Sequence, residues 1–412
     1  MRMKRVVVTG MGAVSPFGRG VPSLVDGLTS GRSAVKRIEV LKEVLGLRSL
    51  VGAVVPGVDG KEIPRKFRRS MSPMSIFATL AAQEAMSAAA LGEDIPGCGR
   101  LGVSIGSTIG SPVTSQAFFE QFIKERSVEQ MKSTAFFQMM NHSCAANVAQ
   151  TLGVRGRILA PSAACATGCQ AVGFAYEMIA SDKQDYMLCG GADELHPLTT
   201  ATFDLINAAS THYNDTPEST PRPFDKERDG VVCSEGAACL LLESLDSALA
   251  RNAPIQAEIL GFATVSDTSN IANPDPAAIR LCMKMALDDA RRTPGEIDYV
   301  NAHATGTEQG DIAESEAIAA LLGSDVPVSS LKGHFGHSMA ASGSLEMVAA
   351  IMMMTDGRIF PTMNLETVDE RCSGIRHVQK LEERRIDMIL KNNFALGGVN
   401  ACMVLGRYDS DR

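Results

Sequence analysis

The sequence has no stretch of apolar residues long enough to cross a bilayer, and it has no excess of positive charge. A membrane-spanning helix needs about 20 consecutive apolar residues, so we expect no membrane insertion. The formal net charge of −8 argues against a protein that binds nucleic acid or anionic membranes in general. Because Met1–Arg5 leads directly into the apolar run Val6–Val8, we also expect no signal peptide.

The spacing of cysteines and glycines excludes further classes. The ten cysteines form no Cys-x-x-Cys pair and no cysteine–histidine ladder, so the pattern predicts neither a disulfide framework nor a metal site. Scattered, reduced thiols are typical of a cytoplasmic protein. The glycine-rich turn Gly10–Gly18 follows an apolar run but lacks the spacing of a dinucleotide-binding loop, and we expect no nucleotide cofactor.

What the chain does contain is short β-branched runs alternating with longer helical patterns rich in alanine and methionine. That alternation predicts a layered α/β fold. The predicted strands are 5–9, 101–105, 186–189, 238–243, 257–263, 299–301 and 401–405, and the predicted helices are 75–90, 169–180, 277–290, 311–321 and 345–354. The length of 412 residues exceeds that of one compact domain, and the segment 248–257 divides the chain into predicted halves, 1–252 and 253–412.

The two predicted halves share a loose sequence pattern. Each opens with a strand that ends in glycine, and each later has a turn with a reactive residue followed by a helix of small residues. These two turns carry Cys165 and His337. We therefore expect a duplicated α/β unit with an active site at the seam between the halves.

Cys165 is the candidate nucleophile. The apolar run Ile158–Ala160 precedes it and the helical pattern Gln170–Ala180 follows it, so the thiol is expected at the first turn of a helix. A helix N-terminus favours the thiolate, and the small neighbours leave the sulfur open to attack an acyl group. The alternative is a buried structural cysteine, the commoner state of a free cysteine.

Three later segments carry the other candidate residues. They are 300–307, with His303, Thr305 and Thr307; 330–338, with Lys332 and His337; and 392–400, with a Gly-Gly turn before the last predicted strand. Together with the Cys165 turn they resemble the β-ketoacyl-[acyl-carrier-protein] synthases of the thiolase superfamily. The segments 6–12, 213–217, 222–230 and 234–237 resemble that family too, so the similarity covers essentially the whole chain. It implies a thiolase-like fold, with two duplicated α/β halves in a layered αβαβα core.

The resemblance implies a decarboxylative condensation in fatty-acid or related acyl-chain biosynthesis. Cys165 matches the residue that accepts the acyl group, and His303 and His337 match the pair that assists decarboxylation of malonyl carrier protein. Two N–H donors from neutral imidazoles can stabilise the resulting enolate, each by about 3–4 kcal/mol. Lys332 matches the family's active-site lysine, and the backbone N–H groups of Cys165 and Leu396 match its oxyanion hole.

Further positions have supporting roles by the same resemblance. Glu314 is expected to pair with Lys332, and Asp311 is expected to cap the N-terminus of the predicted helix 311–321. Thr305 and Thr307 match residues that hold the phosphopantetheine arm. The expected contacts to the acyl substrate are Ile109, Phe203, Phe394 and Leu396. No metal or organic cofactor is implied beyond the phosphopantetheine that the carrier protein bears.

Some positions depart from the family pattern. Ala304 stands where the family has glycine, and Leu396 replaces a phenylalanine that acts as a gate. Ala395 replaces a flexible glycine, which stiffens the turn. The segment 333–336 adds an imidazole and a ring, and we hypothesise that Phe335 compensates for the lost aromatic. These departures leave the acyl substrate, and the choice between type I and type II enzymes, open.

The resemblance also implies partners. The basic cluster Arg65, Lys66, Arg68 and Arg69 matches the place where the family docks the acidic acyl carrier protein. Such a cluster is more commonly just a solvated face. The family is homodimeric, and the apolar stretch 135–140 suits a subunit interface, the wall of the pocket or a buried core segment.

Two alternative functions stay open. One is a thiolase acting on coenzyme A, against which the Lys332 segment and the lack of a second catalytic cysteine near the last turn argue. The other is a catalytically silent partner subunit that determines chain length. Such subunits generally lack the nucleophile, whereas Cys165, His303 and His337 are all present here.

Overall fold

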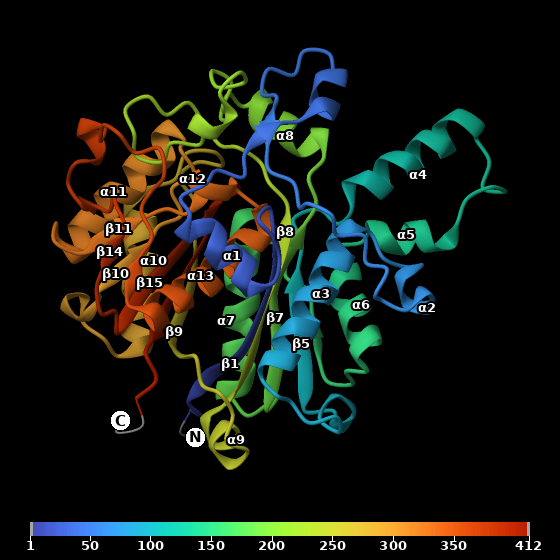
Figure 1. Ribbon diagram of the computed structural model, residues 1–412, viewed down its shortest axis with the longest axis horizontal. Helices are drawn as coiled ribbons and strands as arrows, with labels where there is room; N and C mark the ends of the chain where they lie inside the picture. Colours follow the sequence, from blue (N-terminus) through green and yellow to red (C-terminus); the bar gives the residue numbers. More distant parts are fainter. Residues whose placement is uncertain (1–2, 410–412) are drawn as a thin grey trace.

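The computed structural model describes residues 3–409, and most of its strands join in one mixed sheet (Figure 1). The strands of this sheet are β1 (Val6–Ser15), β2 (Gly18–Arg19), β5 (Leu101–Gly106), β6 (Ile158–Leu159), β7 (Tyr186–Asp193), β8 (Gly236–Ser244), β9 (Ala257–Ser266), β10 (Tyr299–Asn301), β11 (Pro327–Ser329), β13 (Arg376–His377), β15 (Met388–Ala395) and β16 (Val399–Gly406). Two short pairs lie apart from it: β3 (Lys36–Arg37) with β4 (Val51–Gly52), and β12 (Arg358–Ile359) with β14 (Glu382–Glu383).

The order of the strands repeats in the two halves of the chain. From β1 outward the neighbours are β8, β7, β5 and β6, and from β9 outward they are β16, β15, β10 and β11. In each half the first two pairings are antiparallel and the next two are parallel. The halves meet where Val6–Val8 pairs with Ala257–Ile259. The predicted duplication is confirmed, while the boundary after residue 252 stays a prediction.

Helices cover both outer faces of the strands and fill the space between the halves. Their bounds are α1 (Val21–Thr29), α2 (Arg65–Arg68), α3 (Pro73–Ala88), α4 (Pro112–Glu125), α5 (Ser133–Met139), α6 (Ser143–Leu152), α7 (Thr167–Ala180), α8 (Pro197–Leu205), α9 (Leu245–Ala250), α10 (Pro276–Ala290), α11 (Glu308–Leu322), α12 (Lys332–Phe335) and α13 (Ser342–Asp356). None of the described helices combines the length and the hydropathy that a bilayer-spanning segment requires.

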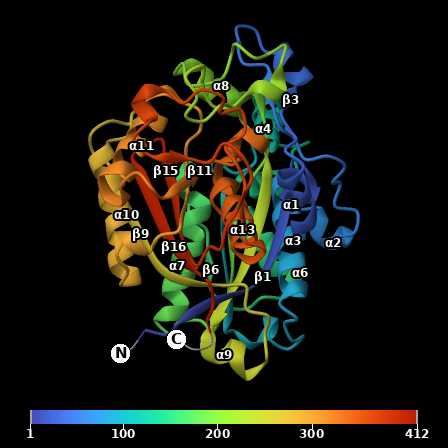
Figure 2. The ribbon, with the colours of Figure 1, turned by 60° about the vertical axis from the view of Figure 1, so that its left-hand side comes forward.

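The three largest apolar cores of the described residues lie between these layers. One lies under α3 and α6, a second lies under α10 and α11, and the largest surrounds α7 and α13. Figure 2 shows α7 and α13 between the strands of the two halves. The layered αβαβα arrangement expected from the resemblance is confirmed. Because strands flank α13 on both sides, almost all of its side chains are buried, Glu346 included.

The N-termini of the two central helices cross at two glycines. A Cβ atom at Gly168 would lie 2.5 Å from the carbonyl oxygen of Ala340, and one at Gly343 would lie 2.5 Å from the backbone nitrogen of Cys169. Real side chains do not approach so closely, and the packed interior has no room to yield. The two glycines therefore allow the two turns that precede α7 and α13 to meet.

These two turns have the same backbone form. Each begins with a non-glycine residue in the left-handed region, Ala164 with φ 44° and Met339 with φ 49°, and each continues as one turn of 3₁₀-helix. Cys165 therefore corresponds to Ala340 in the second half, and the sequence correspondence between Cys165 and His337 is wrong. Strain of this kind persists only where the surroundings enforce it, and it is commonly found at functional sites.

Candidate active site

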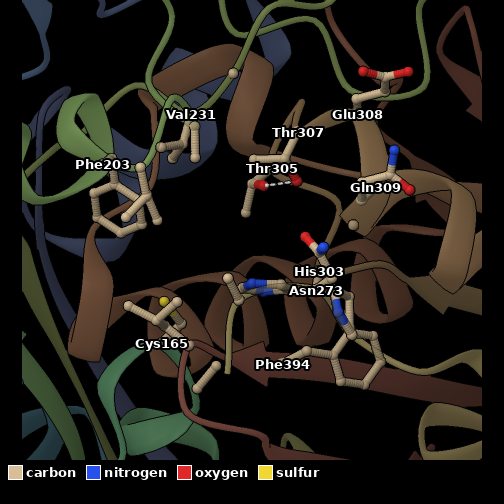
Figure 3. Close-up of a pocket in the computed structure, with 18 of the residues that line it drawn as sticks. Cys165, Phe203, Val231, Asn273, His303, Thr305, Thr307, Glu308, Gln309 and Phe394 are labelled. Carbon is tan, nitrogen blue, oxygen red and sulfur yellow. Dashed lines mark hydrogen bonds between the residues drawn. The ribbon is translucent and has the colours of Figure 1, made fainter. Parts of the chain in front are cut away.

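Cys165, His303 and His337 meet at one cavity of about 400 Å³. Cys165 lies in the turn before α7, His303 follows β10, and His337 follows α12. The sulfur and one nitrogen of each imidazole all lie within 4.8 Å of one another. The two rings stand nearly perpendicular, with their centroids 5.3 Å apart. Figure 3 shows Cys165 and His303 facing this cavity, with Phe394 beside them.

Burial controls the charge on Cys165. The side chain is 6% exposed, and burial raises the pKa of its thiol to about 11, although the positive charge of Lys332 and the backbone N–H groups of Leu396 and Cys165 act in the opposite direction. The thiol therefore keeps its proton at neutral pH. The sequence favoured a thiolate at the start of a helix; in this cavity the cost of desolvating the anion outweighs that effect.

Both imidazoles are uncharged at neutral pH. Burial lowers the pKa of His337 to about 3, and it lowers the pKa of His303 well below its ordinary value, with Lys332 as the next contribution in each case. The amide nitrogen of Asn393 faces Nδ1 of His303 at 3.5 Å, so the ring hydrogen of His303 belongs on Nε2. Neither ring nitrogen of His337 has a hydrogen-bond partner among the described residues.

Lys332 belongs to a buried cluster of charges behind the two imidazoles. Its Nζ lies 2.6 Å from Oε1 of Glu346, and Nζ of Lys391 lies 2.7 Å from Oε2 of the same carboxylate. The hydroxyl of Ser342 donates a third hydrogen bond to it. Burial alone would raise the pKa of Glu346, but the two lysines outweigh it and hold the pKa below the ordinary value. The partner of Lys332 is therefore Glu346, and the predicted pairing with Glu314 is wrong.

Glu314 instead fixes the loop that carries His303. One of its carboxylate oxygens accepts the backbone N–H of His303, and the other accepts the backbone N–H of Ala304. The side-chain amide of Asn392 donates to the same carboxylate at 3.0 Å. Glu314 is buried and reaches the loop because α11 packs directly behind it. The side chain thus sets the direction of the His303 imidazole, and it forms no direct pair with Lys332.

Asp311 does not cap a helix, contrary to the prediction. The helix α11 begins at Glu308, three residues earlier, with Thr307 at the cap position. The Asp311 carboxylate accepts the backbone N–H groups of Gly306 and Phe224, so it ties the loop after His303 to the segment around Phe224. Burial raises the pKa of Asp311 to about 7.

The predicted substrate contacts divide into two groups. The side chains that line the cavity are Phe203, Thr305, Thr307, Phe394 and Leu396. The hydroxyls of Thr305 and Thr307 lie 3.1 Å apart, on the side of the cavity away from Cys165 (Figure 3). Ile109 does not line this cavity, and its side chain is 53% exposed. The structure therefore does not bring Ile109 to the site within one chain.

The Gly-Gly turn after Phe394 forms one rim of the cavity. Gly397 and Gly398 both have left-handed φ values, 92° and 76°, which suit glycine. The turn is held from outside by a hydrogen bond from the backbone N–H of Gly397 to the carbonyl of Ile271. Phe335 does not compensate for the aromatic that Leu396 replaces, because it is fully buried against Phe17, away from the cavity lining.

Sequence reasoning missed the residues that surround the reacting groups. These are Asp193, Glu346, Lys391 and Asn393, all buried. Asp193 ends β7 and accepts the backbone N–H groups of Thr108 and Ala340, so it holds the turn opposite Cys165. A usable signal existed, because each of these polar residues interrupts an otherwise apolar strand or helix pattern.

The predicted docking cluster lies on α2, at the edge of the molecule (Figure 1). Arg65, Lys66 and Arg69 are exposed. Arg68 is half-buried, and one of its terminal nitrogens is buried without a hydrogen-bond partner among the described residues. The cluster therefore presents three cations to solvent, of which Lys66 also lies over the ring of Phe67, and Arg68 points partly into the protein.

The apolar stretch 135–140 is not a buried core segment. It lies in and after α5, its residues are exposed or half-buried, and none of them lines the cavity. The neighbouring helix α4 exposes Phe119, Phe122 and Ile123 as well. In Figure 1 both helices project from one side of the molecule. Of the three interpretations of this stretch, a subunit interface is the one that its exposure favours.

Comparison with known proteins gives full-length matches. The model of the N-terminal domain of β-ketoacyl synthases matches residues 3–248, and the model of their C-terminal domain matches residues 256–366. The 3-oxoacyl-[acyl-carrier-protein] synthase 1 of Haemophilus influenzae is 34% identical over 409 residues, which cover 99% of this chain and 100% of that protein.

Solved structures agree with these matches. A crystal structure of a β-ketoacyl synthase from Burkholderia phymatum is 40% identical, with a TM-score of 0.96, and the match covers 99% of this chain and 100% of that one. A type II PKS ketosynthase, solved in complex with its acyl-carrier protein, is 32% identical with a TM-score of 0.90 and the same coverage. By sequence and by structure, this chain belongs to the β-ketoacyl synthase family.

Proposed function

We propose that this protein is a 3-oxoacyl-[acyl-carrier-protein] synthase, which joins an acyl group to a malonyl unit with release of CO₂. The observation that carries the proposal is the meeting of Cys165, His303 and His337 at one cavity, with their reactive atoms within 4.8 Å of one another. The reaction needs a nucleophile that holds the acyl group and hydrogen-bond donors for an enolate. These residue types supply both.

In the first half-reaction, Sγ of Cys165 attacks the thioester of an acyl carrier protein. The new S–C bond forms, the bond to the pantetheine sulfur breaks, and the thiol proton of Cys165 leaves with that sulfur. Because burial raises the pKa of Cys165, a base is needed at the moment of attack, and the unpartnered, uncharged His337 is close enough to serve. The backbone N–H groups of Cys165 and Leu396, which face the sulfur, stabilise the tetrahedral oxyanion.

In the second half-reaction, malonyl carrier protein loses its carboxylate. The bond between the carboxylate carbon and the α-carbon breaks, CO₂ leaves, and the electron pair moves onto the thioester oxygen. Nε2–H of His303 and a ring N–H of His337 donate to that oxygen. The α-carbon then attacks the acyl thioester on Cys165, whose sulfur leaves as the thiolate and takes a proton from solvent.

The walls of the cavity suit a pantetheine arm. Thr305 and Thr307 offer two hydroxyls for its amides, and Phe203 and Phe394 offer apolar surface. The arm belongs to the carrier protein that delivers the substrate, so the mechanism uses no resident metal or organic cofactor.

The test is incubation with an acyl carrier protein and malonyl carrier protein. We expect β-ketoacyl carrier protein and CO₂ in equal amounts. A thiolase would join two acyl groups without forming CO₂, so product without CO₂ would favour that alternative. A silent partner subunit would form neither, so the absence of product with every acyl chain tried would contradict the proposal.

We also propose that acyl carrier protein docks on the cations Arg65, Lys66 and Arg69. Two features support this surface: its exposed side chains and the family relative solved with its acyl-carrier protein. Charge complementarity of this kind accelerates association and weakens with salt. Arg68 contributes less directly, because part of its guanidinium is buried.

Charge reversal at this surface gives a direct prediction. In Arg65→Glu and Lys66→Glu the apparent KM for acyl carrier protein should rise by about tenfold at low salt, with kcat nearly unchanged. The difference should shrink as salt increases, because exposed charges are screened. Lys380→Glu, at an exposed position near the opposite edge of the sheet, is the matched control. Equal KM values for all three variants and the wild type at low salt would contradict the docking site.

We further propose a homodimer formed through α4 and α5. The exposed apolar side chains of this region are Ile109, Val113, Phe119, Phe122, Ile123 and Phe136. An apolar patch of this extent marks an interaction surface, and a second copy would cover Ile109, which the family resemblance places at the acyl pocket. Sedimentation equilibrium should give twice the chain mass for the wild type and a lower mass for Phe122→Glu. A wild-type monomer would contradict the proposal.

A cytoplasmic location is also proposed. All ten cysteines are free, a state that reducing compartments maintain. Cell fractionation with a soluble cytoplasmic marker tests it, and recovery with a secreted or membrane fraction would contradict it.

A further inference from the structure

Lys391 is a buried cation that the reaction outlined above does not use. It lies in β15, a strand that is buried along almost its whole length. Alternate residues of a strand face opposite sides, so Lys391 and Asn393 point toward the central layer while Asn392 points toward α11. The contacts agree: Lys391 reaches Glu346 on α13, Asn393 faces His303 and the carbonyl of Cys165, and Asn392 reaches Glu314 on α11.

Lys391 has a fixed position. Its side chain is 0% exposed, and Nζ lies 2.7 Å from Oε2 of Glu346 and 2.7 Å from the carbonyl oxygen of Asn392. Lys332 occupies the other carboxylate oxygen of Glu346. An ammonium group buried in this way is costly unless it is paired, and here two ammonium groups share one carboxylate. The cluster therefore carries one positive charge in excess.

That excess charge acts on the catalytic imidazoles. The charged groups that influence His303 and His337 are Lys332, Lys391 and, for His337, Glu346. Burial is the largest cause of the lowered pKa values of both imidazoles, and Lys332 and, to a smaller extent, Lys391 lower them further. Lys332 in turn is influenced by Glu314. Without Lys391, the remaining pair of Lys332 and Glu346 would be neutral. Lys391 is thus the residue that gives the buried cluster behind the imidazoles a net positive charge.

We propose that Lys391 is a positioning residue of the condensing reaction: it clamps Glu346 from the side opposite Lys332 and supplies the buried positive charge that favours uncharged imidazoles and the enolate between them. The inference rests on the proposed function, since it concerns the decarboxylation step of that reaction. Decarboxylation moves a negative charge from the departing carboxylate onto the thioester oxygen, next to His303 and His337. A fixed cation in a medium of low dielectric stabilises this charge without reorganising.

Condensation also requires that the imidazoles next to the enolate be uncharged. An imidazolium next to the enolate would give its proton to the α-carbon, and the malonyl group would end as an acetyl group on the carrier. By disfavouring the imidazolium, Lys391 protects the carbanion until it attacks the thioester on Cys165. The proposal therefore links this lysine to the ratio of β-ketoacyl product to acetyl product.

The experiment compares Lys391→Gln, Lys391→Met and Lys391→Arg with the wild type. Glutamine keeps a hydrogen-bond donor without the charge, methionine keeps only the length, and arginine keeps the charge. Three quantities are measured from pH 3.5 to pH 8, a range that reaches the acid limb set by the imidazoles: acylation of Cys165 by an acyl carrier protein, CO₂ release from malonyl carrier protein, and the ratio of acetyl to β-ketoacyl product. Thermal unfolding identifies variants that do not fold.

We expect Lys391→Gln and Lys391→Met to lower CO₂ release by about tenfold at pH 7, equivalent to one pKa unit of lost interaction. Loss of a cation makes imidazole protonation easier, so the imidazole pKa rises and the acid limb of the pH profile should move to higher pH, with more acetyl product. Acylation of Cys165 should stay within about twofold. Lys391→Arg should restore the wild-type profile.

Several outcomes would overturn the inference. One is a pH profile of the two neutral variants that superposes on that of the wild type. Another is an equal loss in the rates of acylation and decarboxylation. A third is failure of both neutral variants to fold, which would make Lys391 a structural residue. A wild-type enzyme that releases no CO₂ from malonyl carrier protein would instead overturn the proposed function itself, so the two failures are distinguishable.

Discussion

Cys165→Ala abolishes condensation, with the rate falling at least about a thousandfold, while carrier protein still binds. Loss of a catalytic nucleophile has an effect of this size or larger. Of the described residues that line the cavity, Cys165 is the one thiol, and the hydroxyls of Thr305 and Thr307 lie away from it (Figure 3). No neighbouring group can therefore take over the acyl chain.

Intact-protein mass spectrometry separates this loss from a failure of binding. After incubation with acyl carrier protein, the wild type should gain the mass of one acyl group, and Cys165→Ala should gain none. Cys98→Ala, which removes the exposed cysteine, is the matched control and should acylate normally. Continued elongation by Cys165→Ala would show that another residue is the nucleophile. Over a panel of carriers, the adduct mass also reports the preferred acyl chain, which the sequence left open.

The fold could be predicted from the sequence where local pattern and tertiary environment agree. The predicted strands and helices are all present, with ends shifted by a few residues. The strand β15 was missed because Lys391, Asn392 and Asn393 interrupt its apolar pattern. Lys391 finds its partner on α13, Asn392 on α11, and Asn393 in the loop after β10. These partners lie far away along the chain, and no local sequence signal contains them.

The candidate site could be predicted at the level of its reacting residues but not of their supports. Cys165 was singled out by its turn, and His303 and His337 by the family resemblance, and the structure places the three together. The pairing of Lys332 with Glu346 could not be anticipated, since Glu314 is an equally good carboxylate by spacing and only the packing of α13 decides between them. The charge states of Cys165 and His303 could not be predicted either, because they depend on burial and on the nearby Lys332.

His303→Ala and His337→Ala should each reduce CO₂ release by about a hundredfold to a thousandfold, the usual effect of removing one donor from an oxyanion site. His303 sits with Nε2–H available, because Asn393 faces its Nδ1. The matched variants His303→Asn and His337→Asn keep an N–H donor and should lose less. If His303→Ala retains wild-type CO₂ release, the enolate is stabilised elsewhere and the assignment of His303 is wrong.

The two histidines also make folding stability depend on pH. In the unfolded chain an imidazole takes a proton near pH 6.5, whereas burial lowers the pKa of His337 in the folded protein to about 3. As pH falls below about 6.5, the unfolded state binds more protons than the folded one, so stability is lost progressively. His337→Gln removes one such group, and its free energy of unfolding should fall less steeply than that of the wild type between pH 6.5 and pH 4. If the free energies of unfolding of the wild type and of His337→Gln fell equally over that interval, His337 would already be charged in the folded protein. It could then no longer serve as the base for Cys165 or as an uncharged donor to the enolate.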